Sequence, residues 1–311
     1  DAMRSYKPDF LISCHGPFLT GEKIIEERLT IYRDAIQYIH DYAVRGANLG
    51  KTPDELVENF EYPSFFLENY DLQEKYGKVS WSIRNVYNGY LGFFDGKAVN
   101  LEPLSAHKRA KHIFELIGSK EQLISEINKA NQSKNYQWAA ELSDVGLLNF
   151  PNDDQIKNLY SISLENLSLV ETNPIARNYY LSEAYELTNK INPSLEYTVS
   201  AEQAKNIPLS TFFDAMGPRL NSEKAKNKLI KIGFNITDSD EKFGVIVRNQ
   251  IAEISNSYDD SFDVIVSVDS NTWKGIVLKT VSAVQAIASG KLKIDGESIK
   301  FLQFSSLFNN D

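Results

Sequence analysis

The spacing of apolar residues changes twice along the chain, and these changes limit the folds that its 311 residues can adopt. A short apolar run and a turn occupy residues 1–20. From residue 21 to about residue 200 apolar residues recur every three or four positions, which predicts amphipathic helices. From residue 206 on they alternate with polar residues in runs rich in Val and Ile, which predicts strands and short helices. The length exceeds that of one small core, so we expect two or three domains.

The helical region begins with a predicted helix at residues 21–50, with Gly46 and Gly50 as stop signals. Thr52 is placed to cap the next helix. Residues 135–164 are typical of a helix pair from a tetratricopeptide-type array. One such pair cannot bury its apolar face alone, so it must pack on neighbouring helices or on another subunit.

The last third of the chain has the pattern of an α+β domain. Three or four antiparallel strands are predicted after a short helix, with polar turns between them. The expected boundary of this domain falls within residues 192–206. Its predicted helices lie at residues 208–220, 271–289 and 301–309, and its predicted turns at 237–242 and 255–261.

Charge and composition exclude some function classes. Acidic residues exceed Lys and Arg by 42 to 33, for a net charge of −9, which argues against nucleic-acid binding. No run approaches the roughly 18 apolar residues of a membrane span, so we expect a soluble protein. Cys14 is the only cysteine and cannot form an intrachain disulfide, which leaves the compartment open between cytoplasm and periplasm or secretion.

The segment PDFLISCHGPFLTG raises a question, because an apolar run ends at His15 and is broken at once by Gly16 and Pro17. The run predicts a short buried strand whose last side chain lies at the carboxyl edge of a sheet, where ligands and metals bind. The alternative is an ordinary hydrogen-bonded histidine. Cys14 is interpreted as a small buried hydrophobe, with a thiol nucleophile or metal ligand as the alternative.

Residues 76–104, YGKVSWSIRNVYNGYLGFFDGKAVNLEPL, resemble the alkyl sulfatases of the metallo-β-lactamase superfamily, and so do SCHGPFLTG and SLENLSLVETNPIARNYYLSEAYEL. The resemblance implies a multidomain protein. Residues 1–20 would be a strand remnant from the tail of an α/β metallo-β-lactamase domain. Residues 21–200 would form an all-α dimerisation domain that makes a homodimer, and residues 206–311 an α+β domain like sterol carrier protein.

The resemblance implies that His15 is the final histidine ligand of a binuclear zinc site. The zinc motif His-x-His-x-Asp-His is absent from the sequence, and His40, His107 and His112 lie in predicted helices as packing or surface residues. One histidine cannot hold two zinc ions, since catalytic sites use about three protein ligands per metal. We therefore expect the chain alone to be inactive, and its partner to be a missing metallo-β-lactamase portion.

The resemblance also implies that Tyr76 lies near the sulfate group of a substrate, and it matches Tyr87 to a tyrosine of the same segment, so both are candidate catalytic residues. A neutral phenol can donate a proton to a leaving oxygen without adding a charge that must be desolvated. Packing is the alternative for both tyrosines. Trp81 and Ser82 stand where the family has His-Asn, and Trp can neither accept a proton nor make an amide contact, which leaves the usual substrate open.

The C-terminal domain is rich in large apolar side chains, which form either a plain core or a lipid-like tunnel. Phe212, Phe213 and Met216 are the candidates for binding the alkyl chain. Two hypotheses remain. The first is a zinc-dependent hydrolase of alkyl sulfates, with this chain as its C-terminal part. The second is a catalytically silent module that dimerises and binds an apolar or amphiphilic small molecule.

Overall fold

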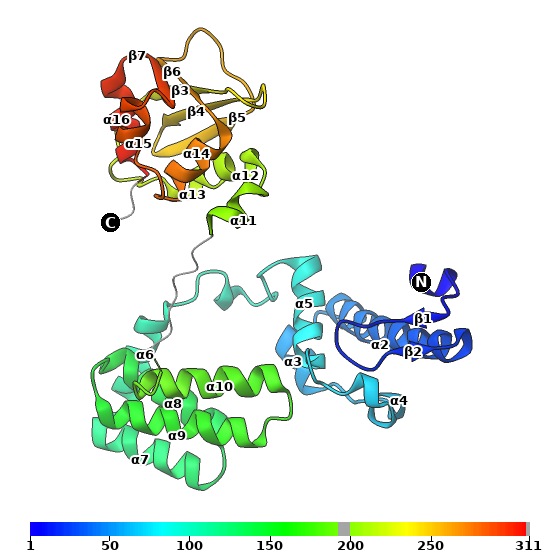
Figure 1. Ribbon diagram of the computed structural model, residues 1–311. Helices are drawn as coiled ribbons and strands as arrows, with labels where there is room; N and C mark the ends of the chain where they lie inside the picture. The colour runs from blue at the N-terminus through cyan, green and yellow to red at the C-terminus, as the bar shows by residue number, and fades with distance from the viewer. Residues whose placement is uncertain (192–199, 309–311) are drawn as a thin grey trace. The chain divides into compact units, whose positions relative to one another are not determined.

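The computed structural model describes residues 1–191 and 200–308. The chain divides into two compact units, Asp1–Pro193 and Ser194–Asp311 (Figure 1). Part of the predicted boundary at 192–206, and residue 309 of the last predicted helix, lie outside the described residues.

The first unit begins with a small hairpin on a long helix. After helix α1 (Ala2–Ser5), strand β1 (Phe10–Leu11) pairs antiparallel with β2 (Leu19–Thr20), and α2 (Glu22–Asn48) follows. The prediction of a buried strand at 10–14 is wrong here. Strand β1 has two residues, Phe10 is 66% exposed and Cys14 is exposed as well. The sheet has only these two strands, so the outward side chains have no second layer to pack against.

Helix α2 packs against α3 (Pro53–Glu58) and α5 (Val79–Leu91). The prediction that Gly46 stops α2 is wrong, because the helix continues to Asn48. A Cβ atom at Gly46 would lie 2.1 Å from Cδ2 of the buried Leu56, so the glycine allows α3 to approach. The predicted cap of α3 is confirmed: Thr52 accepts from the backbone N–H of Glu55, whose carboxylate accepts from Thr52 N–H. Helix α4 (Ser64–Glu68) and the 3₁₀ turns η1 (Tyr70–Leu72) and η2 (Ala98–Asn100) complete this part.

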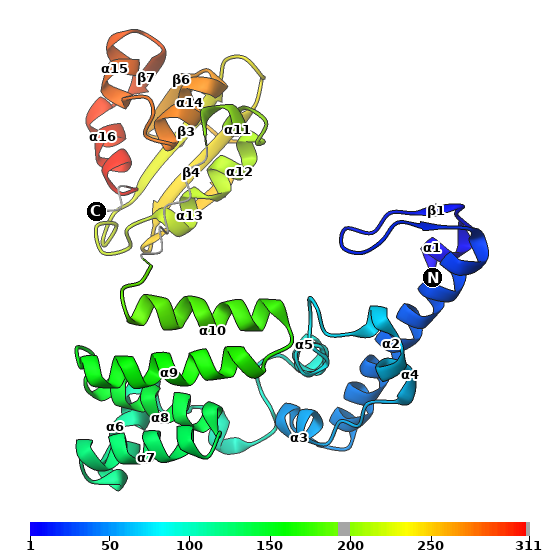
Figure 2. The ribbon, with the colours of Figure 1, turned by 60° about the horizontal axis from the view of Figure 1, so that its bottom comes forward.

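Five further helices form a layered array in the same unit (Figure 2). Each packs on its neighbours, and the predicted pair at 135–164 corresponds to the third and fourth of them. Small and apolar side chains fill the interior of the array, among them Ala139, Leu142 and Leu164. The five helices are α6 (Ala106–Ile117), α7 (Lys120–Gln132), α8 (Tyr136–Asn149), α9 (Asp154–Val170) and α10 (Pro174–Leu187).

The second unit is a five-stranded mixed sheet with helices, in the strand order β5-β4-β3-β6-β7. Its strands are β3 (Ile230–Ile236), β4 (Lys242–Arg248), β5 (Ile251–Ser255), β6 (Val264–Val268) and β7 (Leu292–Gly296). Its helices are α11 (Ala201–Lys205), α12 (Leu209–Asp214), α13 (Met216–Arg219), α14 (Ser270–Val277), α15 (Ala283–Ala288) and α16 (Ser298–Ser306).

The pairing of one strand differs from the prediction, and the structure decides how many strands the apolar runs form. The predicted antiparallel order is wrong for β6, which pairs parallel with β3, because the chain crosses from the β4–β5 hairpin to the far side of β3. The apolar run at 243–255 is two strands, because Asn249 and Gln250 have positive φ angles of 49° and 64°. A two-residue turn with positive φ at both positions matches the twist of a hairpin.

One face of this sheet carries the core of the unit. Side chains at alternate positions of β3, β4 and β6 point to the same face, as the period of a strand requires. Helices α12, α13, α14, α15 and α16 contribute to the same apolar cluster and cover that face. The ring of Phe234 at its centre contacts Phe213, Trp273 and Phe304, which come from three of these helices.

Candidate functional site

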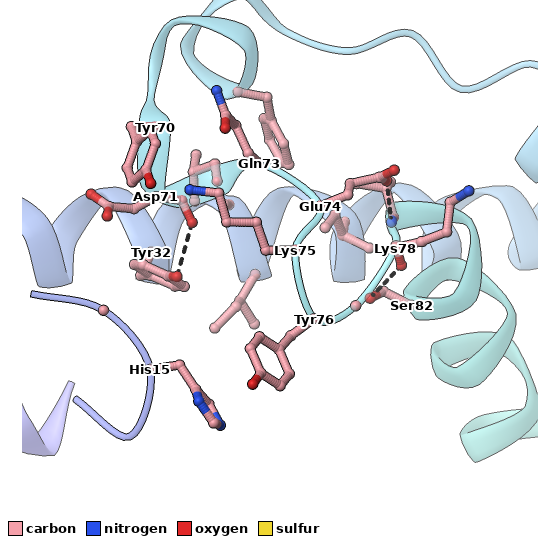
Figure 3. Close-up of a pocket in the computed structure, with 18 of the residues that line it drawn as sticks. His15, Tyr32, Tyr70, Asp71, Gln73, Glu74, Lys75, Tyr76, Lys78 and Ser82 are labelled. Atoms are coloured by element: carbon pink, nitrogen blue, oxygen red, sulfur yellow. Dashed lines mark hydrogen bonds between the residues drawn. The ribbon is translucent and has the colours of Figure 1, made fainter. Parts of the chain in front are cut away.

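A cavity of about 630 Å³ lies in the first unit, between the turn of the β1–β2 hairpin, α2 and the segment that leads into α5 (Figure 3). The hairpin turn contributes His15 and its neighbours, and α2 contributes Tyr32 together with apolar side chains. Phe66, residues 70–79 and Ser82 supply the remaining wall. The cavity therefore combines an apolar floor with several polar groups, which is the usual composition of a small-molecule site.

Two residues selected from the sequence meet in this cavity. The rings of His15 and Tyr76 stack with their centroids 4.0 Å apart and their planes inclined by 22°. Tyr76 is 56% exposed, so part of its surface is accessible to a molecule that enters the cavity. An imidazole and a phenol side by side can accept and donate protons, which are the functions required of acid–base groups.

Hydrogen bonds to the Glu74 side chain help to hold the segment before α5. The Glu74 carboxylate accepts from the backbone N–H of Val79 at 2.7 Å and from the Tyr62 hydroxyl at 2.9 Å. Burial and the hydrogen bond to Glu74 raise the pKa of Tyr62 to about 12. Tyr62 therefore stays protonated at neutral pH and remains a donor to Glu74.

The charged groups of the cavity differ in their partners. Asp71 forms an ion pair with Arg28, and its backbone carbonyl accepts from the Tyr32 hydroxyl at 2.9 Å. Lys75 has no carboxylate partner among the described residues, and its Nζ lies 3.0 Å from the centroid of the Tyr70 ring. The Lys75 ammonium lowers the pKa of Tyr70 by hydrogen bonding. An ammonium without a carboxylate partner is available to an anionic ligand.

Of the other residues selected from the sequence in this unit, one lines the cavity and two do not. Ser82 lines the cavity, and its hydroxyl donates to the backbone carbonyl of Lys78 at 3.1 Å. Trp81 lies beside it on α5 and is partly exposed, but it is not among the residues that line the cavity. Tyr87 is buried in the core of α2, α3 and α5, and its hydroxyl donates to the carbonyl of Asp95 at 3.4 Å. The structure thus brings together His15, Tyr76 and Ser82.

A zinc site does not fit the residues of this chain. No group of three or more His, Cys, Asp or Glu side chains that could hold a metal ion occurs within residues 1–191 and 200–308. His40 is hydrogen-bonded to Asp41 and to the Tyr90 hydroxyl, and His112 to Glu115. Asp41 has a lowered pKa because of its hydrogen bond with His40. His15 therefore has no companion ligands among the described residues.

Sequence reasoning missed Tyr32 and Lys75, which also line the cavity. Tyr32 lies on α2 among apolar residues at helical spacing, which favours a packing role. Lys75 lies in an irregular segment, where charged residues are usually solvated. Only the packing of residues 70–79 against α2 brings both side chains to the same cavity.

A second cavity of about 470 Å³ lies in the C-terminal unit. Met216 lines it, whereas Phe212 and Phe213 do not. The fully buried ring of Phe213 stacks on Phe243 and on Trp273, with centroids 4.1 and 5.4 Å apart. Phe212 is also buried, with Lys274 Nζ 5.6 Å from its ring centroid. Both phenylalanines are core residues.

Comparisons with known proteins agree with this two-unit fold. The family model for alkyl sulfatase dimerisation matches residues 52–190, and the model for the alkyl sulfatase C-terminal domain matches residues 197–311. A solved structure of the inverting sec-alkylsulfatase Pisa1 from Pseudomonas sp. has a TM-score of 0.93 at 24% identity, over all of this chain and 49% of that one. The two proteins therefore share a fold.

Sequence relatives carry the same family name. A linear primary-alkylsulfatase of Pseudomonas sp. (strain ATCC 19151) is 31% identical over 320 residues, which cover 99% of this chain and 60% of that protein. The alkyl/aryl-sulfatase BDS1 of Saccharomyces cerevisiae (strain ATCC 204508 / S288c) is 27% identical over 304 residues, 98% of this chain and 47% of that protein.

The chain belongs to the alkyl sulfatase family and carries its dimerisation and C-terminal domains. It spans about half the length of the curated relatives it matches. In the described part of the chain, no helix has the length and apolar character needed to cross a bilayer.

Proposed function

We propose that this chain is part of a hydrolase that acts on sulfate esters of alkyl chains, and that the cavity around His15 and Tyr76 receives the sulfate end of the substrate. The observation that carries the proposal is the stacked pair of these two residues in one cavity. The names of the relatives supply the substrate class, since alkyl sulfatases match nearly the whole chain.

In this hydrolysis the elements of water are added across the ester, and an alcohol and a sulfate ion are released. As the water oxygen bonds to sulfur, the bond between sulfur and the alkyl oxygen breaks, and that oxygen becomes negative and needs a proton. The Tyr76 hydroxyl supplies that proton, and the resulting phenolate recovers one from the attacking water. Lys75 offers a positive charge to the sulfate group, because no carboxylate in the described structure neutralises it.

Zinc enters the proposal only through His15. The family resemblance implies that this imidazole is one ligand of a binuclear site. The other ligands would have to come from outside residues 1–191 and 200–308, where no metal-binding cluster occurs. The proposed activity therefore belongs to an assembly larger than the described structure.

Titration of the chain with hexyl sulfate, followed by the NMR signals of the His15 ring, tests the site. We expect these signals to shift in a saturable way and the affinity to fall in Tyr76→Ala and Lys75→Gln variants. Lys23→Gln, on α2 but outside the cavity lining, is the charge-matched control. Hexyl sulfate that binds without moving the His15 signals, or with equal affinity in all variants, would contradict the proposal.

A second candidate function is favoured by the C-terminal cavity. Aliphatic and aromatic side chains line most of it, and its two charged lining residues are the exposed cations Arg219 and Lys279. The buried Nε1 of Trp273, which also lines the cavity, has no hydrogen-bond partner in the described part of the chain. Such a cavity suits an amphiphile with an alkyl chain and an anionic head group. The domain would then bind the alkyl sulfate itself in preference to the alcohol.

A further inference from the structure

A single buried asparagine connects the helical array to the candidate site. Asn173 is the N-cap residue of α10 and is 0% exposed. Its Oδ1 accepts hydrogen bonds from the backbone N–H groups of Ile175 and Ala176, both at 3.0 Å. Its Nδ2 donates to the backbone carbonyls of Glu74 at 2.9 Å and Gly77 at 3.1 Å. Every hydrogen-bonding group of the side-chain amide is therefore used.

An ion pair supports the same contact. Glu171 accepts from the backbone N–H of Asn173 at 2.8 Å and from Lys78 Nζ at 2.8 Å. Burial alone would raise the pKa of Glu171, but the hydrogen bonds from Lys78 and from backbone N–H groups outweigh it and lower the pKa. Glu171 is therefore ionised at neutral pH and holds both Lys78 and the backbone of Asn173.

These contacts surround Tyr76. The two carbonyls that Asn173 holds belong to Glu74 and Gly77, so the backbone of Tyr76 is fixed between them. The Tyr76 ring, which this short segment carries, stacks on His15 (Figure 3). We propose that Asn173 is a positioning residue that holds Tyr76 against His15, so that the N-terminus of α10 sets the geometry of the cavity.

The residue type supports this assignment. An N-cap needs only a side-chain oxygen, and Ser, Thr and Asp supply one as well as Asn does. Only an amide offers two N–H donors in addition to that oxygen. Asparagine at this position is therefore explained by the two carbonyls of the Tyr76 segment and not by capping alone.

The test separates these two roles with one substitution. Asn173→Asp keeps the oxygen that caps α10 but loses both donors to Glu74 and Gly77. Asn178→Asp introduces the same charge at an exposed position of α10 and serves as the matched control. The readout is the ring-current shift that Tyr76 imposes on the His15 ring protons, with Tyr76→Leu defining its complete loss.

We expect the His15 signals of Asn173→Asp to move most of the way to their position in Tyr76→Leu, with the helical circular dichroism retained. Asn178→Asp should leave them unchanged. His15 signals that stay in place in a folded Asn173→Asp variant would overturn the proposal. The role of Tyr76 in the reaction rests on the proposed function, but the shift of the His15 signals in Asn173→Asp does not. Failure of hexyl sulfate to bind would therefore contradict the proposed function alone, and an unchanged His15 shift would contradict the positioning role of Asn173 alone.

A measurement on the unaltered chain covers the case in which Asn173→Asp does not fold. Amide hydrogen exchange should show the Val79 N–H, which bonds to Glu74, opening together with the Ile175 and Ala176 amides. Exchange of Val79 that is much faster than that of the two α10 amides would show that Asn173 does not hold the segment.

Discussion

His15 and Tyr76 form a face-to-face pair, with ring centroids 4.0 Å apart, although they come from different elements of the first unit. One lies in the turn of the β1–β2 hairpin, and the other precedes α5. Neither element fixes this contact alone. It depends on α2, which packs against both of them.

The first prediction concerns metal content. Since His15 lacks companion ligands in the described structure, we expect the chain to hold less than one equivalent of tightly bound zinc and to leave dodecyl sulfate unhydrolysed. Equilibrium dialysis with metal analysis and a sulfate-release assay measure both. Two equivalents of tight zinc that are lost together in His15→Ala, and retained in the His107→Ala control, would contradict this expectation.

The close approach of α2 and α3 gives a second prediction. The Cβ of Gly46→Ala would lie 2.1 Å from Cδ2 of Leu56, which is buried, so the leucine would have to move within the core. We expect a loss of about 1–3 kcal/mol in the free energy of unfolding. Gly89→Ala in α5 meets no atom within 4 Å and should instead stabilise the chain by roughly 0.5–1 kcal/mol. Urea unfolding measures both changes, and equal effects of the two substitutions would refute the close-packing role of Gly46.

The fold was predictable where local pattern decides it. The helical period before residue 191 and the alternation in β3, β4 and β6 are visible in the sequence, and so is the cap at Thr52. The parallel pairing of β3 with β6 was not predictable, because it depends on where the chain crosses after β5. The exposure of the β1 segment also escaped prediction, because an apolar run indicates a strand but not the layer that would cover it.

The candidate site, too, was predictable only in part. His15, Tyr76 and Ser82 could be selected from their motifs, but Trp81 and Tyr87 were selected with them and lie outside the cavity. Asn173 carries a helix-cap signature, so the sequence gives no sign of its second role. Its contacts with Glu74 and Gly77 join segments that are far apart in the chain, and no periodicity reports such contacts.

Stability should depend on pH through Glu171. In the folded chain the pKa of Glu171 lies below its ordinary value of 4.5. The ionised carboxylate therefore stabilises the fold at pH values above 4.5, and this stabilisation is lost as the pH falls through the pKa of the folded state. We expect Glu171→Gln to be less stable by about 1–3 kcal/mol at pH 7, with a difference that shrinks below pH 4.5. Urea unfolding at pH 7 and at acidic pH tests this, with the more exposed Glu165→Gln as control. A difference that does not change with pH would exclude this role of Glu171.

Assembly provides a fourth prediction. We expect a homodimer through residues 21–200 with an interface larger than about 2,000 Å², because residues 52–190 match the alkyl sulfatase dimerisation model. Exposed apolar side chains follow α5, and Phe93 among them is 82% exposed. Light scattering at micromolar concentration should give a dimer mass that falls in Phe93→Ser but not in Leu302→Ser, an exposed site of the C-terminal unit. A monomeric mass for the unaltered chain would rule out the dimer.

The last prediction concerns the cavity of the C-terminal unit. Its apolar lining should bind alkyl compounds with an affinity that rises by at most about 0.8 kcal/mol for each added methylene. Ala283→Leu places a larger side chain in the cavity and should weaken binding, whereas Ala288→Leu on the same helix lies outside the lining and should not. Titration with a series of fatty alcohols measures the dependence on chain length. An affinity that does not change with length would mean that the cavity takes no alkyl chain.

The head group is tested by comparing each alcohol with the alkyl sulfate of the same length. Arg219 and Lys279 are the charged residues that line the cavity, and neither forms an ion pair in the described structure, so the sulfate should bind more tightly than the alcohol. Arg219→Gln should reduce this preference, and Lys228→Gln, an exposed cation of the same unit that does not line the cavity, should leave it unchanged. Added salt should weaken the binding of the alkyl sulfate but not that of the alcohol, because salt at 0.1 M screens interactions between exposed charges over a distance of about 10 Å. Equal affinity for the alkyl sulfate and the alcohol at low salt would show that Arg219 and Lys279 do not select the head group.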